Sequence, residues 1–180
     1  VFLFCRRFRV KDYLINNACI SRGGILSDCG YDDFLYGQKV GVVAPYMLTK
    51  LFLTHFNQGG AVVNIASTRA SQSQPDTESY TAAKGGIAAL THALAVSLAG
   101  IVRVNCISPG WITTSADAFC YADNVQHPSR RVGVPSDIAH MVLYLCSEKA
   151  GFINGENITI DGGMSKQMIY HNDHGWKLDV

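Results

Sequence analysis

The sequence has little net charge, no long uninterrupted apolar run and no paired-cysteine motif. Its 180 residues carry a formal net charge of +1, and 16% of them are charged. This balance gives no reason to expect nucleic acid or an acidic membrane surface as a partner. The longest apolar runs are broken by Lys, His, Gly or polar residues, so no segment is typical of a membrane span.

The cysteines and the start of the chain bear on the compartment. Six cysteines are scattered without Cys-x-x-Cys spacing, and the first seven residues are too short and wrongly ordered for a secretory signal. We therefore expect reduced thiols and a cytoplasmic protein. Near the C-terminus, His171 and His174 flank Asp173 and could ligate a metal. No further ligand is evident, so we expect a polar tail and no metal site there.

Strand-like and helix-like segments alternate along a chain that is 48% hydrophobic. This composition suits one domain with a buried core. The alternation predicts an α/β fold with a parallel sheet and helices on both faces. Pro45 predicts a kink or a break in the first long helix, Gly100 should cap the C-terminus of the second, and Ser136 should cap the third. The expected strands cover 13–15, 61–66, 102–107 and 157–160, and the expected helices cover 32–56, 79–98 and 137–147.

Tyr80 and Lys84 lie four residues apart and therefore share one face of the expected helix. Tyrosine has a pKa of about 10, and lowering it by about three units requires roughly 4 kcal/mol of preference for the phenolate. One ammonium at about 4 Å supplies an energy of that size at an effective dielectric near 20. Ser67, just after an apolar strand, could hold the oxygen that gains or loses the proton. The alternative is an exposed pair in which the lysine extends into solvent.

Five blocks of sequence surround and include this pair. They occur in the order Asn16-Asn17-Ala18, Asn64-Ile65-Ala66-Ser67, Tyr80-Thr81-Ala82-Ala83-Lys84-Gly85-Gly86, Arg103 to Thr114, and Gly155 followed by Asp161-Gly162-Gly163. Their order and separations resemble the short-chain dehydrogenase/reductase family, over about residues 11 to 168. The resemblance implies a Rossmann-like, doubly wound parallel sheet, and an NAD(P)-dependent oxidoreductase acting on a small alcohol or carbonyl compound.

The resemblance also implies roles for individual residues. Tyr80 matches the family's acid/base, Ser67 the residue that orients the substrate oxygen, and Lys84 the lysine that lowers the tyrosine pKa and binds the nicotinamide ribose. Residues 111–134 would form a substrate lid. Many family members have an asparagine where Gly41 stands, so we expect Gly41→Asn in a complete homologue to leave activity intact or raise it. The residues expected to bind NAD or NADP are Asn16, Asn17, Ala18, Tyr80, Lys84, Pro109, Gly110, Ile112 and Thr114.

One family feature is missing. No Gly-x-x-x-Gly-x-Gly occurs in the first thirty residues, although such a loop holds the dinucleotide pyrophosphate at a helix N-terminus. We therefore expect residues 1–180 to form a single partial domain that lacks the first βαβαβ portion, with strand 13–15 at an open edge. Two other functions stay open: a catalytically silent fragment or non-enzymatic assembly subunit, and a nucleotide-sensing protein. The resemblance implies a homodimer or homotetramer formed through helices 32–56 and 79–98.

Overall fold

A single sheet forms the centre of the molecule. The computed structural model describes residues 3–5, 13–115 and 119–177. Within these ranges, five strands are ordered in space as they are along the chain. Four of them run parallel: β2 (Tyr13–Asn16), β3 (Gly60–Ile65), β4 (Val102–Pro109) and β5 (Asn157–Ile160). The α/β fold predicted from the alternating pattern is confirmed.

The edge expected at β2 is wrong. A short strand, β1 (Leu3–Cys5), pairs with it in the antiparallel direction, with Leu3 opposite Ile15 and Cys5 opposite Tyr13. The backbone groups on that side of β2 therefore have partners, and the outer position of the sheet belongs to β1. Three residues with no period-two pattern are too few to mark a strand in the sequence.

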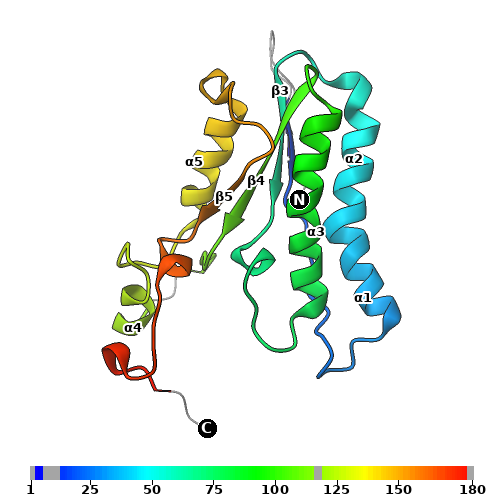
Figure 1. Cartoon of the computed structure of the whole chain (residues 1–180). Coiled ribbons are helices and arrows are strands. Elements are labelled where there is room, and N and C mark those ends of the chain that lie inside the picture. The colour runs from blue at the N-terminus through cyan, green and yellow to red at the C-terminus, as the bar shows by residue number, and fades with distance from the viewer. Residues whose placement is uncertain (1–2, 6–12, 116–118, 178–180) are drawn as a thin grey trace.

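Helices cover both faces of the sheet (Figure 1). On one face lie α1 (Tyr31–Gln38), α2 (Ala44–Phe52) and α3 (Glu78–Ser97), and on the other lies α5 (Pro135–Cys146). All six residues of β3 are buried, as expected for a parallel strand covered on both sides. Val62 and Val104 pack toward Leu94 of α3, whereas Val63 and Ile107 pack toward Leu145 of α5. No described helix is both long enough and apolar enough to cross a membrane.

Near Pro45, where the sequence predicts a kink or a helix break, the helix changes type. Lys39–Val43 forms a π-helical segment between α1 and α2, and Pro45 lies in the first turn of α2. Proline has no N–H to donate to the carbonyl four residues earlier. A wider helical turn just before Pro45 accommodates this missing hydrogen bond. The two helices consequently run on as one long bent rod beside α3 (Figure 1).

The predicted helix ends are partly correct. Gly100 follows α3 with a φ of +79°, the conformation expected of a glycine past a helix end, but the C-cap itself is Leu98, two residues earlier. Ser136 does not cap α5, however. Pro135 occupies the first helical position, which makes Val134 the N-cap, and a carboxylate oxygen of Asp137 accepts the Val134 N–H at 2.8 Å. The acceptor thus comes from inside the first turn, where a negative charge also suits the helix dipole.

Gly41 is held by close packing, and this packing argues against the expectation that Gly41→Asn leaves activity intact. A Cβ at this position would lie 2.7 Å from the Ala83 Cβ on α3, and Ala83 is fully buried. We expect Gly41→Ala to lower the free energy of unfolding by about 1–3 kcal/mol. Gly30→Ala is the matched control, because a Cβ there meets nothing within 4 Å. Urea unfolding measures both variants, and equal stabilities would contradict the close contact.

Candidate active site

Ser67, Tyr80 and Lys84 meet at the carboxyl end of β3. Ser67 follows the strand directly, and Tyr80 and Lys84 project from successive turns in the first half of α3. The Ser67 side chain lies close enough to Tyr80 to lower the pKa of the Tyr80 hydroxyl. The Lys84 Nζ donates to the Ile65 carbonyl at 2.7 Å and lies 5.4 Å from the centre of the Tyr80 ring. The sequence prediction that these three side chains come together is therefore correct.

The electrostatics of Tyr80 differ from the sequence-based expectation. Burial raises its pKa above the ordinary value of 10.0, although the Ser67 side chain and the charge of Arg69 act in the opposite direction. The expected lowering by Lys84 is not found in this structure. Removing the phenol from water disfavours the phenolate. At neutral pH the Tyr80 hydroxyl therefore carries its proton and is a proton donor.

Lys84 is buried, with only 4% of its surface exposed. Burial lowers its pKa, whereas the neighbouring thiols of Cys19 and Cys106 act to raise it. The hydrogen bond to Ile65 holds the ammonium at the end of β3. This arrangement excludes the alternative in which lysine extends into solvent.

Tyr80 and Ser67 lie where two cavities meet. The first, which we call the apolar cavity, has a volume of about 700 Å³ and includes aliphatic side chains of α5. The second, the polar cavity, has a volume of about 760 Å³ and lies on the side of residues 68–74. Both are lined by Ser67, Tyr80, Gly110 and Ile112. Of the residues expected to bind a cofactor, the apolar cavity is lined by Asn17, Tyr80, Lys84, Pro109, Gly110, Ile112 and Thr114.

The end of β4 brings a backbone segment to the wall of both cavities. Gly110 is required there, because a Cβ would lie 2.5 Å from the Asp161 Cβ. Ile112 forms an isolated bridge with Gly133, in which the Gly133 N–H donates to the Trp111 carbonyl and the Thr113 N–H to the Gly133 carbonyl. In the described residues, the N–H and carbonyl of Ile112 itself have no backbone partner. They are available to a polar group in the cavity.

Asn16 and Ala18 do not line the apolar cavity. Asn16 is 3% exposed and donates through its amide to the Asn64 side chain at 2.8 Å. Asn64 in turn donates to Thr91 of α3 at 2.9 Å, so these side chains connect β2, β3 and α3. The geometry gives Asn16 a structural role, and cofactor binding by Asn16 and Ala18 stays a prediction. An asparagine inside the apolar run 61–66 was the sequence signal for this network.

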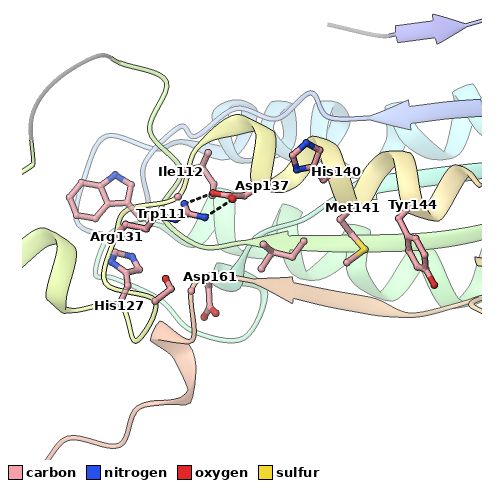
Figure 2. A pocket seen from close by; sticks show the side chains of 13 residues that line it. Trp111, Ile112, His127, Arg131, Asp137, His140, Met141, Tyr144 and Asp161 are labelled. Carbon is pink, nitrogen blue, oxygen red and sulfur yellow. Dashed lines mark hydrogen bonds and ion pairs between the residues drawn. The ribbon is translucent and has the colours of Figure 1, made fainter.

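The region expected to form a lid is described at residues 111–115 and 119–134, whereas 116–118 lie outside the described residues, and two of its rings pack against Trp111. The Phe119 ring packs edge-on against the Trp111 ring, with 5.3 Å between the ring centres. The centre of the His127 ring lies 6.2 Å from that of Trp111. Beyond Trp111 lies a third cavity of about 430 Å³, bounded by α5 and the end of β5 (Figure 2). On its wall Arg131 forms a two-point ion pair with Asp137, which lowers the pKa of Asp137 to about 2.

Arg69 lies beside Ser67 and Tyr80 and was not singled out from the sequence. It follows Ser67 by two positions, lines the polar cavity, and places its guanidinium 5.8 Å from the centre of the Tyr80 ring. Its only signal was its place in the loop after the serine strand. As for metals, no group of three or more His, Cys, Asp or Glu side chains among the described residues is arranged to hold an ion.

A parallel sheet with helices on both faces, and cavities at the carboxyl ends of its strands, defines a Rossmann-like α/β protein. A family model described as enoyl-(acyl carrier protein) reductase matches residues 4–165. The chain belongs to the short-chain dehydrogenase/reductase family.

Two curated relatives represent the matches at the level of sequence. An uncharacterized oxidoreductase of Thermotoga maritima is 44% identical over 172 residues, which cover 88% of this chain and 67% of that protein. The human dehydrogenase/reductase SDR family member 4 is 32% identical over 168 residues, which cover 87% of this chain and 60% of that protein. The chain thus spans about two thirds of the length of these relatives.

Solved structures agree with the fold. An apo SCOR enzyme from Clostridium thermocellum is 50% identical and superposes with a TM-score of 0.86, covering 93% of this chain and 68% of that one. A 4-hydroxyisoleucine dehydrogenase complexed with NADH is 32% identical with a TM-score of 0.77, covering 87% of this chain and 70% of that one.

Proposed function

We propose that this chain carries the catalytic residues of an NAD(P)-dependent oxidoreductase that transfers a hydride between a nicotinamide cofactor and a small alcohol or carbonyl compound. The observation that carries the proposal is the position of Tyr80 and Ser67 at the junction of two cavities. One cavity has room for a nicotinamide and the other for a substrate, so a proton and a hydride can reach the same carbon–oxygen bond from two sides. Binding of NADH by a relative of 32% identity supports the choice of cofactor.

The residues of the apolar cavity fit the nicotinamide half of such a cofactor. The N–H and carbonyl of Ile112 match the two hydrogen-bonding groups of a carboxamide, and Thr114 adds a hydroxyl close by. Lys84 would bind the ribose hydroxyls through its ammonium, and Asn17 would border the more distant part of the nucleotide. Pro109 and Gly110 shape the wall, where the absence of a side chain at Gly110 permits close approach. When bound, the nicotinamide would supply or accept the hydride.

Tyr80 and Ser67 would act on the substrate oxygen. Because the pKa of Tyr80 is raised, its hydroxyl holds a proton at neutral pH and can donate it to a carbonyl oxygen during reduction. Ser67 would donate a hydrogen bond to the same oxygen and so favour the charge that develops there. In the reverse direction Tyr80 would accept the alcohol proton, which requires the phenolate and therefore a higher pH.

We also propose that residues 1–180 form one partial dinucleotide-binding domain and that the protein assembles as a homodimer or homotetramer through the long helices. Apolar side chains on the outer surface of α2 support this assembly. Tyr46, Met47 and Leu51 are 42%, 41% and 65% exposed. Solvent-exposed groups of this kind are typical of subunit contacts.

Calorimetric titration of the full chain with NADH and with NADPH tests the proposed function. We expect saturable one-to-one binding of at least one of the two nucleotides. Lys84→Met should weaken binding, because Lys84 lines the cavity, whereas Lys50→Met on the exposed surface of α2 should not. A chain that binds neither nucleotide would instead fit a catalytically silent fragment or an assembly subunit.

A further inference from the structure

We propose that Arg69 binds a carboxylate of the substrate, which makes the substrate a hydroxy acid or the matching keto acid. The proposal deepens the proposed function and rests on it, since it concerns the compound on which Tyr80 acts. It comes from the position in the polar cavity, beside Tyr80, of one cation that has no acidic partner among the described residues.

The backbone fixes Arg69 close to the reacting groups. The Arg69 N–H donates to the Ser67 Oγ at 3.2 Å, which ties the turn Thr68–Ala70 to the serine. The guanidinium lies over the Tyr80 ring, with its carbon 5.8 Å from the ring centre. An anion held by Arg69 would therefore lie near the oxygen that Ser67 and Tyr80 are placed to bind.

Arg69 has no acidic partner among the described residues. Its side chain donates to the Gln74 side chain, a neutral group that accepts through one oxygen. A guanidinium carries five N–H donors in a planar fork, a shape that matches the two oxygens of a carboxylate. Since Arg69 is partly buried, a counter-ion in the cavity would offset the cost of removing its charge from water.

Among the described residues, the other charged group on the wall of the polar cavity is Asp161, and its oxygens already have partners. They accept the N–H groups of Gly163 at 2.9 Å and Ser165 at 2.8 Å. These backbone dipoles compensate the negative charge of Asp161. Hydroxyl and amide groups make up much of the remaining wall, and they suit the polar part of a small acid. They belong to Ser21, Gln72, Ser73 and Gln126.

A binding experiment without turnover tests the proposal. Trp111 lines the polar cavity, so in a Trp176→Phe background its fluorescence reports occupation, since the chain has two tryptophans. Butyrate and butyramide have nearly the same shape and differ in charge. We expect butyrate to bind at least about tenfold more tightly, as charge-assisted two-point hydrogen bonds provide. Arg69→Gln should remove this preference, Arg69→Lys should keep part of it, and Lys50→Met should leave it intact.

Equal affinity for the two compounds, absence of any butyrate effect, or a preference that survives Arg69→Gln would overturn the proposal. Turnover then separates it from the proposed function. With oxidised nucleotide present, 3-hydroxybutyrate should have a higher kcat/KM than its uncharged methyl ester, and Arg69→Gln should reduce only the first value. If Arg69 merely held the Tyr80 ring, both values would fall together. Equal kcat/KM for acid and ester would refute the carboxylate site and leave the proposed oxidoreductase function standing. Failure to bind nucleotide would refute the proposed oxidoreductase function, whatever the result with butyrate.

Discussion

Tyr80→Phe should lower kcat for carbonyl reduction by about 10²–10⁴-fold, the usual range for loss of a general acid. The substitution removes only the hydroxyl and keeps the ring near Lys84 and Arg69, whose cationic groups lie 5.4 and 5.8 Å from its centre. Nucleotide affinity should therefore change little. Reduction is measured by the loss of NADH or NADPH absorbance. Tyr31→Phe is the control, since Tyr31 is 80% exposed on α1.

The role of Tyr80 also predicts how the rates of reduction and oxidation depend on pH. Because burial raises the pKa of Tyr80, the donor stays protonated throughout the neutral range. The rate of reduction should be flat there and fall only above about pH 10, whereas the rate of oxidation should rise with pH toward that point. A Tyr80→Phe variant that keeps wild-type rates would remove Tyr80 from the mechanism.

Lys84→Met should lower kcat/KM by about 10²–10³-fold, as expected when one positioned donor is removed from a site of developing charge. The variant loses the ammonium between Ile65 and the Tyr80 ring. Lys50→Met removes a charge of the same sign from the exposed side of α2 and should have no such effect. Steady-state kinetics of the two variants side by side make the comparison, and equal losses would contradict a local role for Lys84.

Lys84→Met should also change how the free energy of unfolding depends on pH. Burial lowers the pKa of Lys84 in the folded chain below its ordinary value of 10.5. In the pH range just below 10.5, Lys84 therefore binds more protons in the unfolded chain than in the folded chain. The contribution of Lys84 to the free energy of unfolding consequently rises with pH in this range. Lys84→Met removes that contribution. Urea unfolding at several pH values should show the wild type gaining stability relative to the variant as the pH approaches 10.5, and a constant difference would refute it.

The sequence predicted the parts of the fold that depend on repeated patterns. Strands β3 and β4 are apolar because both faces are covered, and α3 has an alanine-rich helical composition, so each was found to within a few residues. The strand β1 and the π-helical turn before Pro45 depend on tertiary contacts and backbone bonding that a local pattern does not encode. Gly41 shows the same limit, because the need for glycine there comes from Ala83 on another helix.

The site was predicted in outline for a different reason. Ser67, Tyr80 and Lys84 come together because a parallel strand ends where the next helix begins, and this follows from chain order. The direction of the Tyr80 pKa could not be predicted, since it depends on how deeply the ring is buried. The inward position of Asn16 and the lack of an acidic partner for Arg69 among the described residues likewise depend on which neighbours the fold supplies.

The most direct test of the account observes Tyr80 itself while nucleotide binds. With ¹³C at the ring carbon that bears the hydroxyl of tyrosine, NMR resolves Tyr80 from the exposed Tyr31, and the Tyr80→Phe spectrum provides the assignment. On saturation with NADH or NADPH the Tyr80 resonance should shift and the Tyr31 resonance should not. A nucleotide that binds without moving the Tyr80 signal would place the cofactor elsewhere and contradict the proposed function.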